Sequence, residues 1–430
     1  MNVARGEQVL PFQSPARFQF PARPGPALIA CLALACLWLT SCLQPASAQP
    51  GPQAAGQTKE LFSTAGPISA ARSGWTYEAA GGGGTVFLPF AGRYPNKSGR
   101  LQSPFFSLDR TADRPGYYVL TFKAKSTASG YWWLDYRDEQ GEALPDCNSA
   151  IYPSAEFSDY QQFIYVSGRV REVQIAFVST GQVEVDDVRF AETTAAAAAA
   201  WCDAVEHNLP PLAFQAPADA MQKLPKTAAA LRSGKPWRVL MLGDSIVNDS
   251  FNSVFQSLLQ RDFPDSRFTF VLSVLGSTGC PRYRKPEEFK KYVADQKPDL
   301  LMIGGISNFA DFTTEESAAL ADVVRMAREQ INCEVLVMSQ PLSRDWRADR
   351  PAGGWRALAA DPGWRRNLDA SRARDIARTL DVPFWDMTTP CQDYLATAGD
   401  FSFNRDFVHN DDCGKQVIGR VMMAHFLTAP

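Results

Sequence analysis

The chain has 430 residues, of which 45% are apolar and 21% are charged, and its formal net charge is −3. This composition is ordinary for a globular protein and excludes a wholly disordered chain. Without a basic excess the protein does not look like a nucleic-acid binder, and its length suffices for two domains, each with its own core.

Residues 1–48 have the features of an export signal. Arg17 and Arg23 precede the apolar run 27–39, and small residues follow it. That run is too short to span a membrane comfortably. Two cleavage sites remain open. The sequence Leu-Thr-Ser-Cys that ends at Cys42 resembles the lipobox of bacterial lipoproteins, whereas residues 46–48 resemble an ordinary signal-peptidase site. We therefore expect an exported protein that is secreted, periplasmic or anchored to a membrane through a lipidated Cys42.

The next two segments differ in composition. Residues 49–60 are rich in Gln, Gly, Pro and Ala, which is typical of a flexible tether. Residues 61–192 contain short alternating runs of β-branched and aromatic residues, separated by Gly, Ser, Asp and Pro. These runs predict an antiparallel β-sandwich. They lie at 117–122, 131–136, 162–166, 173–177 and 183–190.

The predicted sandwich resembles carbohydrate-binding modules of the jelly-roll type, a likeness carried by residues 117–124 and by the closing strand 185–190. The resemblance implies a jelly roll. Aromatic side chains suit the apolar face of a sugar ring, although alternation along a strand places about half of them in the core. The candidates are Tyr131, Trp132, Trp133 and Tyr136. Asp186 and Asp187 are candidate ligands of a structural calcium ion, because Ca²⁺ prefers carboxylate oxygens.

Residues 193–235 are expected to connect the two domains. They contain the run of alanines 195–200, which is either helical or of low complexity, and then Pro210 and Pro211, which break any helix.

From residue 236 to residue 430 apolar strand-like runs alternate with amphipathic helical patterns. This alternation predicts a parallel sheet covered by helices on both faces, with the site at the carboxyl ends of the strands. The expected strands are 238–242, 268–274, 300–303, 334–338 and 382–385. The expected helices are 246–262, 286–295, 314–331, 363–380 and 412–427.

A serine stands where the first of these strands ends. Gly243, Asp244 and Ser245 follow the strand, and the helix begins immediately after them. The N-terminus of a helix favours negative charge that develops beside it. Asp and Ser are also common helix caps, so this tripeptide alone would be a weak signal for a nucleophile.

A histidine near the other end of the chain strengthens the signal. The chain has three histidines: His207 near the connector, His425 in an apolar stretch, and His409 just before the last predicted helix. Only His409 follows an acidic residue, Asp406, at a distance of three positions. Such a carboxylate can orient an imidazole, whose ordinary pKa of about 6.5 suits a general base.

The sequence Gly243-Asp244-Ser245 and the later pair Asp406 and His409 resemble, in this order, the motifs of the SGNH (GDSL-type) hydrolases. The resemblance covers about residues 236–430. The resemblance implies a flavodoxin-like three-layer α/β/α fold with a five-stranded parallel sheet. It also implies that Ser245 is the nucleophile, His409 its base and Asp406 the residue that orients the base. The family also has a glycine after the second strand, whose amide donates to the oxyanion, and Gly276 or Gly279 is the candidate here. It has a Gly-x-Asn motif after the third strand, which in this sequence is longer by one residue and offers the Asn308 side chain as a second oxyanion donor.

Six cysteines lie beyond the export signal: Cys147, Cys202, Cys280, Cys333, Cys391 and Cys413. No CxxC spacing occurs among them, so we expect no zinc site. The serine mechanism that the resemblance implies needs no metal and no organic cofactor. Cys391 and Cys413 bracket the loop that carries His409, and a bridge between them and free buried thiols are both open.

The resemblance implies an exported serine esterase, with acetyl esters of polysaccharides as the favoured substrates. Polysaccharides are favoured because of the predicted sandwich and export, whereas the catalytic residues do not specify them. Two alternatives are a glycan-binding protein with an inactive hydrolase domain, and an acyltransferase or lipase that uses the same three residues.

Overall fold

The computed structural model describes residues 59–64, 74–78, 99–108, 114–179, 183–304, 314–341, 368–397, 403–405 and 409–429. The predicted export signal and nearly all of the predicted tether lie outside these residues. Within the described residues, no helix combines the length and the apolar character needed to cross a membrane.

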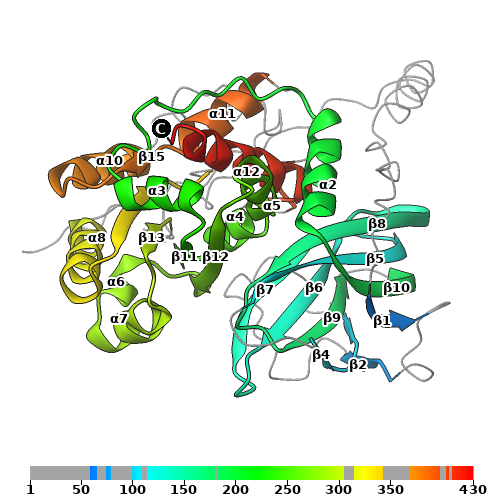
Figure 1. The fold of residues 1–430 in the computed structure, drawn as a ribbon. Coiled ribbons are helices and arrows are strands. Elements are labelled where there is room, and N and C mark those ends of the chain that lie inside the picture. Colours follow the sequence, from blue (N-terminus) through cyan, green and yellow to red (C-terminus); the bar gives the residue numbers. More distant parts are fainter. Residues whose placement is uncertain are drawn as a thin grey trace, which may run out of the picture. The chain divides into compact units, whose positions relative to one another are not determined.

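The N-terminal part contains two antiparallel sheets in its described residues (Figure 1). The first has the order β1-β10-β5-β8, formed by β1 (Glu60–Thr64), β10 (Val183–Thr193), β5 (Gly116–Ser126) and β8 (Ser154–Val166). The second has the order β2-β3-β9-β6-β7, formed by β2 (Thr76–Glu78), β3 (Gly99–Gln102), β9 (Glu172–Ser179), β6 (Gly130–Arg137) and β7 (Ala143–Ile151). A short strand, β4 (Phe106–Ser107), also pairs with β9.

The strand order confirms the predicted jelly roll. When the short β2 and β4 are set aside, the chain crosses between the two sheets in the order expected for two Greek keys. Alternation then fills the core between the sheets. Leu120 and Phe122 point inward from β5, and Trp132 and Leu134 from β6, and all four are 2% exposed or less.

The same alternation divides the aromatic candidates for sugar binding. Trp132 and Tyr136 belong to the core, whereas Tyr131 and Trp133 lie on the opposite face of β6 and are half-buried. The candidate calcium ligand Asp187 lies 3.3 Å from the Lys123 ammonium. In the described ranges, no three His, Cys, Asp or Glu side chains come together as a metal site.

The C-terminal part contains a parallel sheet with the order β12-β11-β13-β14-β15. Its strands are β11 (Pro236–Gly243), β12 (Arg267–Val274), β13 (Leu300–Ile303), β14 (Glu334–Met338) and β15 (Phe384–Trp385). This is the flavodoxin-like order, which reverses between β11 and β13, and a ligand site is expected at such a reversal. The predicted five-stranded parallel sheet is confirmed.

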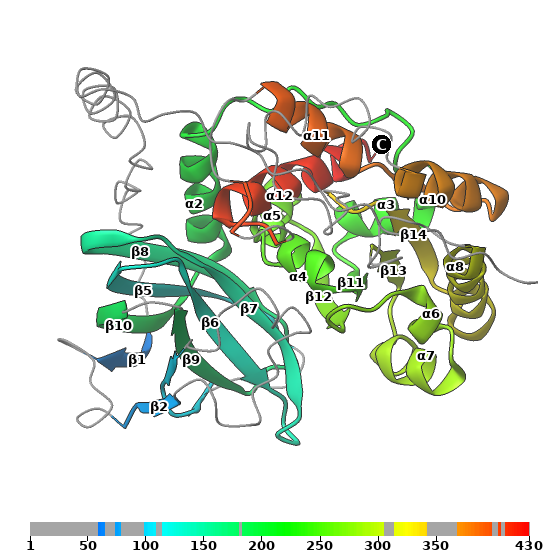
Figure 2. The same ribbon diagram turned by 180° about the vertical axis from the view of Figure 1, so that it is seen from behind.

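Helices cover both faces of this sheet, which confirms the three layers (Figures 1 and 2). Val239 and Met241 of β11 face one layer, whereas Leu240 and Leu242 face the other. The first layer includes α3 (Pro225–Ser233), α4 (Ser245–Phe251), α5 (Phe255–Asp262), α11 (Thr388–Thr397) and α12 (Asp412–Phe426). The second includes α6 (Cys280–Tyr283), α7 (Pro286–Tyr292), α8 (Thr314–Met326) and α10 (Leu368–Thr379).

The helix expected at 246–262 is two helices, α4 and α5, with a break around Val254. Val254 has the left-handed φ of 61° and is fully buried. Two serine hydroxyls compete with the backbone just before it. The Ser250 hydroxyl donates to the Ile246 carbonyl and the Ser253 hydroxyl to the Ser250 carbonyl.

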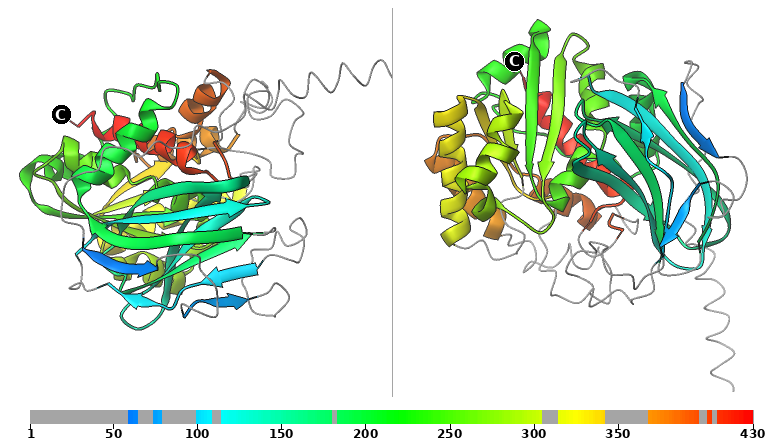
Figure 3. Two further views of the ribbon diagram at one scale, coloured as in Figure 1. Left: turned by 90° about the vertical axis from the view of Figure 1, so that its right-hand side faces the viewer. Right: turned by 90° about the horizontal axis from the view of Figure 1, so that it is seen from below.

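The segment between the two predicted domains is folded and packed. Its alanine run begins α2 (Ala195–His207), whose Ala198 and Cys202 are fully buried. Two sandwich residues, Phe163 and Tyr165 of β8, join the same apolar cluster as α2 and the helices of the first layer. Figure 3 shows the sandwich strands beside the helices of this layer. The sandwich and the α/β part therefore share buried surface.

Candidate active site

The turn from β11 into α4 presents Ser245 at the edge where the sheet order reverses. Asp244 caps α4, because its carboxylate accepts from the amides of Ile246 at 2.9 Å and Val247 at 3.4 Å. The Tyr283 hydroxyl donates to the Gly243 carbonyl at 2.6 Å and fixes the other side of the turn. Ser245, the first residue of α4, is half-buried and so remains accessible.

Close packing beneath this turn requires a glycine. A Cβ on Gly304, the residue after β13, would lie 2.8 Å from a methyl group of Val247 and 3.2 Å from Met338. The absence of a side chain lets α4 approach the carboxyl ends of the neighbouring strands.

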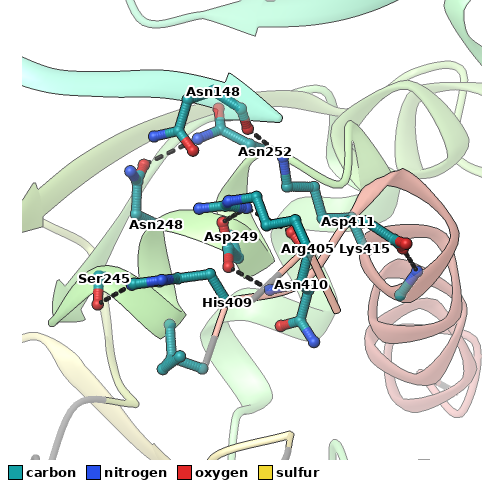
Figure 4. A network of polar contacts seen from close by, with 12 residues as sticks. Asn148, Ser245, Asn248, Asp249, Asn252, Arg405, His409, Asn410, Asp411 and Lys415 are labelled. Atoms are coloured by element: carbon teal, nitrogen blue, oxygen red, sulfur yellow. Dashed lines mark hydrogen bonds and ion pairs between the residues drawn. The ribbon is translucent and has the colours of Figure 1, made fainter. Parts of the chain in front are cut away.

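His409 faces Ser245 across the end of the sheet, and its Nε2 lies 3.0 Å from the Ser245 Oγ (Figure 4). This is the distance at which an imidazole can take the hydroxyl proton of a nucleophile. The structure thus brings together two residues that the sequence predicted as nucleophile and base. The third predicted member, Asp406, lies outside the described residues, and so does Asn308.

Hydrogen bonds within the loop that carries His409 hold its conformation. The Arg405 amide donates to the His409 carbonyl at 3.0 Å, and the Asn410 side chain donates to that of Asn404 at 2.7 Å. The Asp411 carboxylate then caps α12 by accepting from the Gly414 amide at 3.0 Å. Gly414 is obligatory there, since a Cβ would lie 2.1 Å from the Phe403 carbonyl oxygen.

The same loop is also tied to α4. The Asp249 carboxylate accepts from the Arg405 guanidinium at 2.9 Å and from the Asn410 amide at 2.7 Å. This ion pair is buried, with side-chain exposures of 2% for Asp249 and 5% for Arg405. Ser245 and Asp249 are thus one helical turn apart on α4, and each contacts the His409 loop (Figure 4).

Strand β7 of the sandwich also contacts α4. The carboxylate of Asp146 accepts from the Asn248 side chain at 2.8 Å, and its carbonyl accepts from Asn252 at 3.3 Å. Burial raises the pKa of Asp146, and its hydrogen bonds with Asn148 and Asn248 and the charge of Arg405 oppose that rise.

Two further contacts join the sandwich to α12. The Tyr152 hydroxyl donates to the Asp411 carboxylate at 2.7 Å, and the Lys415 ammonium donates to the Asn148 carbonyl. The sandwich therefore contacts both helices that flank the Ser245–His409 pair.

The two glycine candidates for an oxyanion donor lie in different places. Val274, the last residue of β12, pairs with Gly243. The amide of the next residue, Leu275, donates a hydrogen bond to the Gly243 carbonyl at 3.2 Å. Gly276 comes next, in the turn after β12, and is exposed. Gly279 is buried and forms the N-cap of α6. Gly276 is therefore the candidate that directly follows the strand end paired with Gly243.

Asp244 is a fully buried carboxyl group directly before Ser245. Burial raises its pKa to about 6, and its bonds with the Ile246 and Val247 amides and the charge of His409 oppose the rise. The Gln340 side chain donates to its second oxygen at 3.2 Å. Near neutral pH the protein therefore keeps a costly buried charge beside the nucleophile.

Replacing this carboxyl group should change how stability depends on pH. A raised folded-state pKa gives stability that is complete below the unfolded value of about 3.9 and is lost as pH rises through about 6. Asp244→Asn keeps an acceptor oxygen but cannot ionise. Wild type loses this stability between pH 4 and pH 8, whereas the variant does not. We therefore expect the free energy of unfolding of the variant, minus that of wild type, to be larger by about 2–3 kcal/mol at pH 8 than at pH 4. Urea unfolding at both pH values measures this, and an equal difference at both would contradict it.

The structure also places the two other histidines and the six cysteines. His425 is packed, as predicted: it is 2% exposed, stacks on Trp385 and contacts the Val421 carbonyl at 2.8 Å, and burial lowers its pKa. His207 is exposed at the end of α2. The six cysteines of the described residues are free thiols, so the bridge between Cys391 and Cys413 is absent.

Sequence reasoning missed the residues that support the pair. They are Asp146, Asn248, Asp249, Gln340 and Arg405. A helical spacing signal existed for one of them, since Asp249 lies four residues after Ser245 and so on the same face of α4. Asn248 lies three residues after Ser245 on the same helix, whereas Asp146, Gln340 and Arg405 come from distant parts of the chain, where no local pattern identifies them.

Comparison with known proteins gave matches among solved structures alone. No protein-family model and no curated protein matches this sequence. The structure is similar to a two-domain esterase active on acetylated mannans, with 16% identity over 49% of this chain and 53% of that chain and a TM-score of 0.38. This chain therefore spans about half the length of that esterase.

Two further similar structures are matched over nearly their whole length. One is a catalytic mutant of an acetylxylan esterase from Geobacillus stearothermophilus, with 17% identity over 45% of this chain and 96% of that chain and a TM-score of 0.36. The other, from Parabacteroides merdae, is described as a GDSL-like lipase and has 14% identity over 45% of this chain and 97% of that chain and a TM-score of 0.37.

Proposed function

We propose that the protein is an SGNH-type serine esterase that removes acyl groups, with acetyl groups on polysaccharides as the favoured substrates. The observation that carries the proposal is the 3.0 Å contact between the His409 Nε2 and the Ser245 Oγ at the point where the sheet order reverses. An activated hydroxyl beside a helix N-terminus is suited to attack an ester carbonyl.

The proposed reaction has two halves. In the first, the Ser245 Oγ attacks the carbonyl carbon while His409 takes its proton. The Ser245 and Gly276 amides and the Asn308 side chain hold the oxyanion. The ester bond then breaks, and the proton passes from His409 to the leaving sugar hydroxyl. In the second half, water attacks the acyl-enzyme with His409 again as base, which releases the acid and restores Ser245.

The polysaccharide substrate is supported by the jelly roll that contacts both helices of the site. Tyr131 and Trp133 are the half-buried aromatic side chains that remain as candidates for sugar stacking. The proposal includes export of the protein, after cleavage at either of the two sites near residues 42 and 48. An exported enzyme reaches polysaccharides outside the cell. The role of Asp406 in orienting His409 is part of the proposal as well.

Two measurements on the purified protein test this function. We expect acetate release from p-nitrophenyl acetate and from at least one member of a panel of acetylated xylans, mannans and other polysaccharides. We also expect a fluorophosphonate to add covalently to Ser245, as peptide mapping by mass spectrometry would show, and to stop acetate release. A folded protein that releases no acyl group and is not labelled would overturn the proposal, and retention on a glycan column would then favour the glycan-binding alternative.

A further inference from the structure

Helix α4 holds both the proposed nucleophile and the anchor of the loop that carries the proposed base. Ser245 begins the helix, and Asp249 follows one turn later on the same face. The Asp249 carboxylate accepts from the backbone amide of Asn410, which directly follows His409, at 2.7 Å. A single rigid turn of helix therefore sets where the His409 loop lies relative to Ser245.

The contacts of Asp249 are those of a buried junction. Asp249 is 1% exposed and Asn410 is 1% exposed. One carboxylate oxygen accepts from Arg405 at 2.9 Å while the other accepts from Asn410. Arg405 in turn donates to the Asn410 carbonyl, and its own amide donates to the His409 carbonyl at 3.0 Å. The peptide group between His409 and Asn410 is thus held at its carbonyl by Arg405 and at its amide by Asp249.

We propose that Asp249, together with Arg405, is a positioning residue that sets the distance between the His409 imidazole and the Ser245 hydroxyl. The proposal rests on the proposed function, because positioning matters for a base and its nucleophile. Asp249 touches neither the substrate nor the reacting atoms. It acts through the backbone of Asn410, and its loss should let the imidazole move away from the 3.0 Å contact.

The first test compares two Asp249 variants with wild type in turnover of p-nitrophenyl acetate. Asp249→Ala removes both acceptor oxygens, and Asp249→Asn keeps one of them for the Asn410 amide. Displacement of a catalytic group by about 1 Å can cost on the order of 100-fold in rate. We therefore expect kcat to fall about 10- to 100-fold in Asp249→Ala and less in Asp249→Asn, with KM within about twofold of wild type, because substrate contacts are untouched.

A matched control separates positioning from general destabilisation. Arg420 lies on α12 and pairs with Asp203 and Glu206 of α2 at 2.6 and 2.7 Å, away from the His409 loop. Arg420→Gln should lower the melting temperature without changing kcat. If Asp249→Ala fails to fold, the near-isosteric Asp249→Asn and the doubly neutral Asp249→Asn with Arg405→Gln decide the question, since the double change leaves no unpaired buried charge.

A second readout does not depend on turnover. The chain has three histidines, so selective ¹⁵N labelling of histidine gives a spectrum in which His409 is assigned by its loss in His409→Gln. We expect the His409 ring signals to shift or broaden in both Asp249 variants and to be unchanged in Arg420→Gln. The proposal is overturned if kcat and these signals match wild type in a folded Asp249→Ala or Asp249→Asn protein. If wild type itself turns over no ester while the signals respond to Asp249, the esterase function fails and the positioning stands.

Discussion

Replacement of Ser245 by alanine is expected to lower kcat for ester hydrolysis by on the order of 10³–10⁶-fold. The change removes the Oγ that lies 3.0 Å from the His409 Nε2, so no acyl-enzyme can form. Loss of a single member of such a unit costs nearly as much as loss of the whole, and donors that remain for the oxyanion leave a small residual rate. Acetate release from p-nitrophenyl acetate and from the best polysaccharide measures the effect.

The fold should survive this substitution. Ser245 is the first residue of α4, where alanine is accepted well, and the cap from Asp244 to Ile246 and Val247 is untouched. Circular dichroism and the melting temperature check that the variant is folded. Ser233→Ala, at the exposed end of α3, is the matched control and should keep full activity. Turnover by Ser245→Ala at the wild-type rate would place the nucleophile elsewhere.

Replacement of His409 by alanine is expected to lower kcat by on the order of 10³–10⁵-fold, since general-base assistance alone contributes 10²–10⁴ and an unactivated hydroxyl is a weak nucleophile. The truncation leaves a space beside Ser245 that imidazole from solution can enter. We therefore expect added imidazole to restore part of the activity of His409→Ala, measured with p-nitrophenyl acetate.

The other histidines give a control that is close in chemistry. His207 is exposed at the end of α2, so His207→Ala should retain the wild-type rate and gain nothing from imidazole beyond the background reaction. Activity of His409→Ala equal to that of His207→Ala would show that a different group activates Ser245.

Much of the α/β fold could be predicted because each of its elements has a local cause. The strands β13 and β14 have the bounds that the apolar runs 300–303 and 334–338 indicated. These strands are buried on both faces and so appear in the sequence as continuous apolar runs. The break between α4 and α5 could not be predicted from apolar periodicity, since it depends on Ser250 and Ser253 bonding to backbone carbonyls.

The site shows the same division. Ser245 and His409 could be identified because each stands at a characteristic place, one after the first strand and the other before the last helix. The residues that hold them could not, because Asp249 and Arg405 are separated by 156 positions and Asp146 and Asn248 by 102. Such pairs follow from tertiary packing, and neither composition nor spacing in one sequence reveals them.

The hydrogen bonds of β7 with α4 and α12 have a consequence for how this chain folds. Asn248, Asn252 and Lys415 have hydrogen-bond partners on the sandwich, and Phe163 and Tyr165 lie in the apolar cluster of the α/β layer. Cutting the chain between the two parts would expose that apolar surface and strip these polar groups of partners, which is costly for buried groups. We therefore expect the jelly roll and the α/β part to unfold in one cooperative transition, because neither can separate from the other without losing these contacts.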